Sequence, residues 1–152
     1  MAIVVPVPGD QSISLQEAVF DYNGTLADGG VVSEQVVALI GRLKGQLTVT
    51  ILSAGTFGGL DEASARLGGT ALRVESGADK AAYVAARSGV VAIGNGRNDV
   101  GMFGAAALSI CVVGPEGAAR EAIEAATVVV GSPEAAIRLL LDPRRLTATL
   151  RR

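Results

Sequence analysis

The chain has 152 residues, of which 49% are hydrophobic and 18% charged, and its formal net charge is −2. This composition is unlike that of disordered chains, and the charge gives no electrostatic case for binding nucleic acid or an anionic membrane. The chain contains no His, which excludes Ser-His and Cys-His nucleophile pairs and histidine metal sites. Any metal must therefore be held by oxygen ligands.

The hydrophobic pattern predicts an N-terminal β-hairpin followed by alternating helices and strands. The hairpin strands are expected at 3–7 and 12–20, on either side of a turn at 8–10. Helices are then predicted over 33–44, 58–67, 78–88, 99–106, 116–125 and 133–141, and strands over 47–52, 71–74, 90–93, 109–113 and 127–130. This alternation predicts an α/β fold, a three-layer Rossmann-like parallel sheet with helices on both faces.

We expect one domain over residues 1–152, with the hairpin at 1–20, a core at 17–141 and a solvated basic tail at 142–152. No basic leader precedes a long apolar stretch, and no apolar run approaches 18 residues. The protein is therefore expected to be cytoplasmic, with no membrane or nucleic-acid partner. Cys111, in an apolar run, is expected to be a buried, inert thiol.

Chemically unusual residues follow three of the predicted strands. Asp21 ends the first strand and enters a turn at 22–25, Ser53 follows the second, and a Gly- and Asn-rich segment at 94–99 follows the third. Loops that leave the carboxyl ends of parallel strands meet in one crevice. Lys80, near the start of the preceding helix, can reach the same place.

These residues have the chemistry that phosphoryl transfer needs. Asp21 can attack phosphorus and form an acyl phosphate. Hydroxyl and ammonium donors for the phosphoryl oxygens are present in Thr25, Ser53 and Lys80. An octahedral Mg²⁺ can take oxygen ligands from Asp21, the Asn95 carbonyl and Asp99.

Taken singly, each feature also has an ordinary structural explanation. Residues 21–25 can be a turn whose side chains serve only the backbone. Ser53 can be a plain strand-end hydroxyl, and Lys80 a solvated lysine. Residues 94–99 can be a turn with a helix cap. Their joint occurrence, in order and each on the expected type of element, favours a functional site.

The same residues resemble the four motifs of the haloacid-dehalogenase superfamily. Asp-Tyr-Asn-Gly-Thr at 21–25 resembles the first motif, Ser53 the second, Lys80 the third, and Gly-Asn-Gly-Arg-Asn-Asp at 94–99 the fourth. The resemblance covers residues 17–131 and implies a Mg²⁺-dependent phosphohydrolase that works through a phospho-aspartate. The fourth motif is most similar to that of soluble proteins resembling the phosphorylation domain of P-type ATPases.

The resemblance implies three sets of site residues. The catalytic residues would be Asp21, Asn23 and Lys80. The phosphate-binding residues would be Gly24, Thr25, Ser53, Ala54, Gly55, Lys80 and Asn98. The metal ligands would be Asp21, Asn23, Asn95 and Asp99. The expected substrate is a phosphorylated small molecule or a phosphoprotein.

Two positions depart from the superfamily pattern. Its phosphatases carry a general acid-base aspartate where this chain has Asn23, and such proton transfer typically contributes on the order of 10²–10⁴ in rate. We therefore expect anhydride, acyl or aryl phosphates to be preferred over sugar phosphates, and phospho-Asp21 to hydrolyse slowly. Asn95 also replaces an aspartate, which predicts weaker Mg²⁺ binding. An alternative is a binding or regulatory protein that has lost efficient turnover.

The spacing between motifs leaves no room for the cap domain that many members of the superfamily insert over the site. An open site should accept a large substrate or be covered by a neighbouring subunit. The N-terminal hairpin resembles a feature that tetrameric uncapped members use for assembly. A homo-oligomer such as a tetramer is therefore an alternative to a monomer. For the function, an assembly module without catalysis is a third alternative, after the phosphohydrolase and the binding or regulatory protein.

Overall fold

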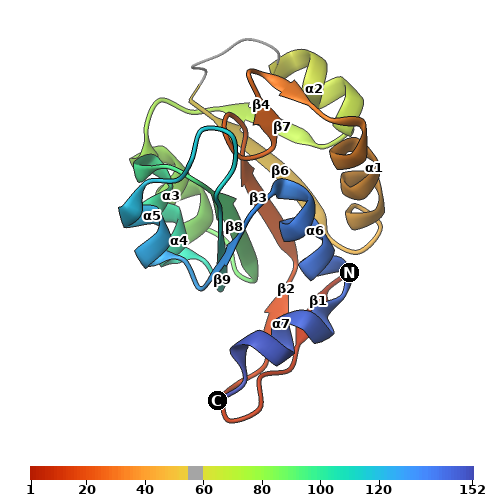
Figure 1. Ribbon diagram of the computed structural model, residues 1–152, viewed down its shortest axis with the longest axis vertical. Helices are drawn as coiled ribbons and strands as arrows, with labels where there is room; N and C mark the ends of the chain where they lie inside the picture. The colour runs from red at the N-terminus through yellow and green to blue at the C-terminus, as the bar shows by residue number, and fades with distance from the viewer. Residues whose placement is uncertain (55–59) are drawn as a thin grey trace.

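Six parallel strands form the central sheet of the protein, seen in a computed structural model that describes residues 1–54 and 60–152 (Figure 1). In chain order the strands are β3 (Glu17–Asp21), β6 (Thr48–Ser53), β7 (Thr70–Arg73), β8 (Val90–Gly94), β9 (Leu108–Val112) and β10 (Val128–Val130). Their order across the sheet is β10-β9-β8-β3-β6-β7. The chain runs outward from β3 through β6 and β7, then returns to the other side of β3. The boundary between β3 and β8 is therefore a topological switch point, where open α/β sheets bind ligands.

Helices cover both faces of this sheet (Figure 1). One face carries α1 (Glu34–Leu43), α2 (Leu60–Leu67) and α6 (Pro133–Leu141). The opposite face carries α3 (Gly77–Ala85), α4 (Val100–Ala105) and α5 (Arg120–Ala125), with the 3₁₀ turn η1 (Arg97–Asp99) before α4. The predicted three-layer Rossmann-like fold is confirmed. None of the described helices is long and apolar enough to cross a membrane.

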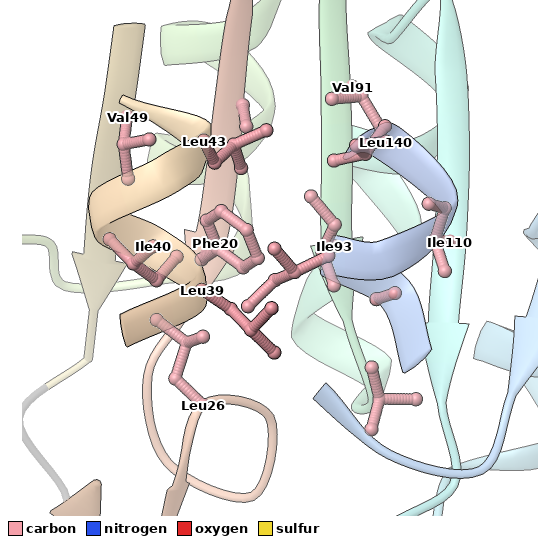
Figure 2. Close-up of a cluster of buried hydrophobic side chains, with 14 of the residues drawn as sticks. Phe20, Leu26, Leu39, Ile40, Leu43, Val49, Val91, Ile93, Ile110 and Leu140 are labelled. Atoms are coloured by element: carbon pink, nitrogen blue, oxygen red, sulfur yellow. The ribbon is translucent and has the colours of Figure 1, made fainter. Parts of the chain in front are cut away.

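Strand side chains alternate between two hydrophobic cores because neighbouring residues on a strand point to opposite faces. Phe20, Ile93 and Ile110 join the core beneath α1 and α6 (Figure 2). Their strand neighbours join the core beneath α3, α4 and α5, and these are Val19, Ala92 and Cys111. Burial raises the pKa of the Cys111 thiol, and the nearby Asp99 raises it further, which agrees with the predicted inert cysteine.

The N-terminal hairpin is confirmed, but its second strand is shorter than predicted. β1 (Ile3–Val5) pairs antiparallel with β2 (Ile13–Leu15), and β3 begins only at Glu17. The backbone N–H groups of Gln16 and Glu17 both donate to the Gly89 carbonyl, at 2.7 and 3.2 Å. The chain therefore leaves the hairpin at Gln16 and changes partner to the parallel sheet.

The C-terminal residues form a helix, α7 (Pro143–Leu150), where a solvated tail was predicted. Proline begins the helix, and Leu146 is buried in the core that also contains the β1 side chains. Arg152 forms an ion pair with Asp10 of the hairpin, Nη2 to Oδ2, at 3.2 Å. The apolar side of α7 thus covers the base of the hairpin, while its arginines remain exposed.

A short second hairpin follows the Asp21 turn, and the sequence pattern did not predict it. It consists of β4 (Ala27–Asp28) and β5 (Val31–Val32), joined by Gly29 and Gly30 with φ of 60° and 85°. Two consecutive positive φ values are what a tight type I′ turn requires. Apart from this hairpin and α1, nothing is inserted between β3 and β6. Among the described residues between β6 and β8, only α2, β7 and α3 are present.

Candidate active site

The strand register brings the predicted site residues to one edge of the sheet. Asp21, the last residue of β3, pairs with Leu52 of β6, so Ser53 lies one residue further along the neighbouring strand. On the other side of β3, β8 ends at Gly94, and Asn95 enters the following loop. The expected convergence of these strand ends therefore occurs, and it occurs at the switch point.

Lys80 joins two carboxylates in the interior. It lies in the first turn of α3 and is fully buried, and its ammonium donates to Asp21 Oδ1 at 2.7 Å and to Asp99 Oδ1 at 2.8 Å. Burial alone would lower the pKa of Lys80, but the two carboxylates outweigh it and hold the pKa above its usual value. Lys80 is therefore a buried cation with two anionic partners, which excludes the solvated alternative.

Asp21 is a buried carboxylate with a raised pKa. Desolvation is the main cause, the negative charge of Asp99 adds to it, and Lys80 and Thr25 oppose it. The result is a pKa of about 6, compared with an ordinary 3.8. Without a bound cation, Asp21 thus titrates near neutral pH, as functional carboxylates often do.

The raised pKa predicts a pH-dependent stability difference between the wild type and Asp21→Asn in EDTA. A carboxyl whose folded pKa exceeds its unfolded value stabilises the protein at low pH, and this stabilisation is lost as the pH rises through about 6. The variant lacks this titration. The free energy of unfolding of the variant, relative to that of the wild type, should therefore increase by up to about 3 kcal/mol as the pH rises from about 4 to about 7. Urea titrations across this range test it, and a constant difference would contradict the raised pKa.

Thr25 lies between the second oxygen of Asp21 and the side chain of Asn95. Its Oγ1 is 3.0 Å from Asp21 Oδ2 and 3.2 Å from Asn95 Oδ1. A hydroxyl has a single proton, so it can donate to only one of these acceptors at a time. Asn95 Nδ2 donates to the Gly117 carbonyl at 3.2 Å, which keeps Oδ1 turned toward Thr25. One of the two oxygens, Asp21 Oδ2 or Asn95 Oδ1, is therefore always left able to accept another hydrogen bond.

Asp99 holds the loop after β8 in place through hydrogen bonds. Its Oδ1 accepts from Lys80, and its Oδ2 accepts from the backbone N–H groups of Asn95 and Gly96 at 2.9 and 3.0 Å. A Cβ at position 94 would collide with this carboxylate, so Gly94 permits the approach. Asp99 is fully buried and does not line the adjacent cavity. This geometry argues against direct metal coordination by Asp99 and indicates that it positions Lys80 and the loop.

A polar cavity of about 200 Å³ opens in front of Asp21, lined by Asp21, Asn23, Ala54, Asn95, Gly96, Asn98 and Glu116. The Oδ1 of Asn23, one of these residues, is buried and has no hydrogen-bond partner among the described residues. A buried acceptor without a partner costs about 1–3 kcal/mol, which a bound cation would offset. No group of three or more His, Cys, Asp or Glu side chains in the described part of the chain is arranged to hold a metal. The available donors, a carboxylate and amide oxygens, nevertheless suit Mg²⁺, which keeps several of its waters.

Most of the residues predicted from the motifs meet at this place. Asp21, Asn23, Ala54, Asn95 and Asn98 line the cavity, and Thr25 and Lys80 contact Asp21. Ser53 is buried at the end of β6. Gly24 has φ of 77°, and a Cβ there would lie 2.7 Å from Asn95 Nδ2, so glycine is required. Gly55 lies outside the described residues.

Glu116 is the cavity residue that the motifs do not include. It was assigned to the start of a helix over 116–125, but α5 begins only at Arg120. Glu116 instead lies in the loop after β9, which leaves the same edge of the sheet as the Asp21 turn. An acidic residue shortly after a predicted strand end, in the segment Gly-Pro-Glu-Gly, was the available signal.

Solved structures of haloacid-dehalogenase proteins share this architecture. A putative hydrolase of that family from Streptomyces avermitilis superposes with a TM-score of 0.69 and 22% identity, covering 96% of this chain and 91% of the other. The 3-deoxy-D-manno-octulosonate 8-phosphate phosphatase of Moraxella catarrhalis, in complex with magnesium, phosphate and KDO, superposes with a TM-score of 0.71 and 16% identity, covering 89% and 90%. The chain has the haloacid-dehalogenase fold, as predicted. The narrower similarity to P-type ATPases stays a prediction.

A sequence relative is the uncharacterized protein MJ0073 of Methanocaldococcus jannaschii. It is 45% identical over 62 residues, which are 41% of this chain and 67% of that protein. The chain belongs to the same family as this archaeal protein, whose name states no activity. No family model matches the chain.

Proposed function

We propose that the protein is a Mg²⁺-dependent phosphohydrolase that transfers a phosphoryl group from its substrate to Asp21 and then to water. The environment of Asp21 carries the proposal. This carboxylate ends the central strand at the switch point and faces a polar cavity. Lys80 and Thr25 hold its two oxygens in a fixed orientation. A preoriented, desolvated carboxylate beside a buried cation is suited to attack phosphorus.

In the first step, one Asp21 oxygen forms a bond to phosphorus while the bond to the leaving-group oxygen breaks. Lys80 holds the attacking carboxylate in place, and Asn98 at the cavity wall can donate to phosphoryl oxygens. The Thr25 hydroxyl can do so as well once its single proton turns away from Asp21. In the second step, water attacks the acyl phosphate and releases inorganic phosphate and free Asp21. Mg²⁺, when bound, would be held by oxygens of Asp21, Asn23 and Asn95 and would neutralise phosphate charge.

The remaining phosphate contacts in the proposal come from the end of β6 and the Asp21 turn. Ser53 and the backbone of Ala54 and Gly55 would donate to phosphoryl oxygens, as would the backbone N–H of Gly24. The magnesium and phosphate ions in the Moraxella catarrhalis complex support a magnesium and phosphate site on this fold, by analogy. The proposed substrate is a phosphorylated small molecule, with a phosphoprotein as the alternative that an open cavity also admits.

Asn23 sets the expected substrate preference. An amide neither protonates a leaving alkoxide nor activates water, so the first step favours acidic leaving groups and the second step is slow. These are the properties predicted from Asn23 in the sequence. Asn23 is also the observation that favours the second candidate, a binding or regulatory protein that keeps the phosphate site and turns over poorly.

The substrate preference gives a direct test of this function. With Mg²⁺ present, initial rates on acetyl phosphate and p-nitrophenyl phosphate should exceed those on sugar phosphates. Asn23→Asp should raise sugar-phosphate turnover by on the order of 10²-fold, because it restores a proton donor. Higher wild-type rates on sugar phosphates would contradict the leaving-group argument. If no phosphate ester or anhydride shows turnover that depends on both Mg²⁺ and Asp21, the binding-protein alternative holds.

A further inference from the structure

The loop that carries Glu116 is tied directly to Asn95. The Ala119 N–H donates to the Asn95 carbonyl at 2.8 Å, and the Asn95 side-chain amide donates to the Gly117 carbonyl at 3.2 Å. Within the loop, the Gly117 N–H donates to the Gly114 carbonyl at 2.8 Å and closes a tight turn. Backbone and side chain of Asn95 thus fix the residues that follow Glu116, which sets the position of Glu116 relative to the cavity.

The carboxylate of Glu116 and the amide of Asn95 meet above Gly24. A Cβ placed on Gly24 would lie 3.1 Å from Glu116 Cδ, 3.2 Å from Glu116 Oε1 and 2.7 Å from Asn95 Nδ2. Both side chains line the cavity, as do Asp21 and Asn23. The Oδ1 of Asn23 is buried, and no described residue donates to it. A carboxylate from outside the four motifs therefore lies beside the position where the superfamily pattern has an aspartate.

Within residues 1–54 and 60–152, Glu116 has no ion pair or hydrogen bond that would hold it for a structural purpose. Other glutamates of the same region are paired: Glu121 with Arg97 and Glu124 with Arg120, at 2.8 and 2.9 Å. Among the described residues, none donates to the Glu116 carboxylate. An unpaired carboxylate facing a polar cavity is available to a cation.

The charge balance of the site favours a divalent cation. Asp21, Asp99 and Glu116 carry three negative charges, and Lys80 neutralises one of them. The two remaining negative charges match one Mg²⁺. Without Glu116, the site would have a single excess negative charge, and ligand charge is a main determinant of affinity for such ions.

We infer that Glu116 is a ligand of the Mg²⁺ in this site and supplies, from the loop after β9, the negative charge that Asn95 lacks. The inference rests on the proposed function, because it assigns a ligand to the metal proposed there. It also replaces the expectation of a metal site weakened by the loss of one carboxylate. In this chain the second metal-binding carboxylate comes from Glu116, in the loop after β9, instead of from position 95.

Isothermal titration of the metal-free 152-residue protein with MgCl₂ tests this assignment without any turnover. Glu116→Gln should weaken Mg²⁺ binding by roughly tenfold or more, since it removes one charged ligand. Asn95→Asp in the Glu116→Gln background should recover most of the lost affinity, because the charge returns to the usual position. Glu124→Gln, on the exposed side of α5, is the matched control and should bind as the wild type does.

The outcomes separate this inference from the proposed function. If the wild type binds Mg²⁺, Asp21→Asn weakens binding and Glu116→Gln does not, the Glu116 assignment is overturned while the phosphohydrolase proposal stands. A Glu116→Gln variant that keeps its Mg²⁺ affinity and instead alters the pH profile of turnover would make Glu116 a proton-transfer group and overturn the assignment equally. If the wild type binds no Mg²⁺, both proposals fail.

Discussion

Replacing Asp21 by Asn is expected to lower Mg²⁺-dependent hydrolysis of acetyl phosphate by on the order of 10⁴-fold or more, as loss of a catalytic nucleophile does. The amide has almost the same shape as the carboxylate but cannot form an acyl phosphate. Asn also removes the buried charge that is desolvated in the metal-free protein. The variant should therefore remain folded, and at neutral pH without metal it should be at least as stable as the wild type.

Initial rates at saturating Mg²⁺ measure this effect, with Asp61→Asn as the matched control. Asp61 lies exposed on α2, so the same change there should leave the rate within about twofold of the wild type. Turnover by Asp21→Asn within tenfold of the wild type would show that another group accepts the phosphoryl unit. The proposed chemistry would then be wrong, although the fold and cavity would be unaffected.

Lys80→Met is expected to destabilise the folded protein by about 3–5 kcal/mol near neutral pH, because it removes one partner of a buried ionic cluster. Lys80 is the cation between Asp21 and Asp99, which it contacts at 2.7 and 2.8 Å. Methionine fills a similar volume without charge. Both carboxylates would then face each other uncompensated. Urea denaturation at pH 7 measures the loss, which should shrink toward about pH 4 as Asp21 becomes protonated.

A second substitution identifies the cause of this destabilisation. Asp99→Asn in the Lys80→Met background removes one of the two uncompensated charges and should recover part of the lost stability. A structural effect of lost packing would not respond in this way. If Lys80→Met costs less than about 1 kcal/mol, or if Asp99→Asn makes it worse, the buried charge cluster is not the stabilising element described above.

Much of the fold could be predicted because local pattern and global fold agree along most of the chain. Strands such as 47–52 and 109–113 are short apolar runs between turn residues, and Ser33 provides a helix cap whose Oγ accepts from the Val36 N–H at 3.1 Å. The site followed from the same argument. Once the strands are parallel, residues such as Asp21 and Asn95 must meet at one edge.

The parts that could not be predicted depend on contacts between distant segments. Nothing local shows that Gln16 and Glu17 donate to Gly89 and end the hairpin early, and the burial of Leu146 depends on the distant strand β1. The β4–β5 hairpin is only a few residues long and gives no periodic signal. Its shape depends on two consecutive glycines and on the Tyr22 hydroxyl, which donates to the Gly30 carbonyl at 2.7 Å.

The proposed metal ligands were the part of the site that was hardest to predict from the sequence. A motif gives residue types in order, but it does not show which oxygens are already used. Both oxygens of Asp99 accept hydrogen bonds, one from Lys80 and the other from two backbone N–H groups. No described residue donates a hydrogen bond to Glu116. Only the three-dimensional arrangement distinguishes a supporting carboxylate from an available one.

Asp21 is the residue proposed to receive the phosphoryl group. Incubation with acetyl phosphate and Mg²⁺, followed by acid quenching and peptide mass spectrometry, tests it most directly. Because Asn23 should make hydrolysis of the intermediate slow, the wild type is predicted to carry one phosphoryl group on the peptide that contains Asp21. Hydroxylamine should remove this group, and Asp21→Asn should lack it. Continued turnover with no phosphoryl group on Asp21, or with one on another residue, would show that Asp21 is not the phosphoryl acceptor.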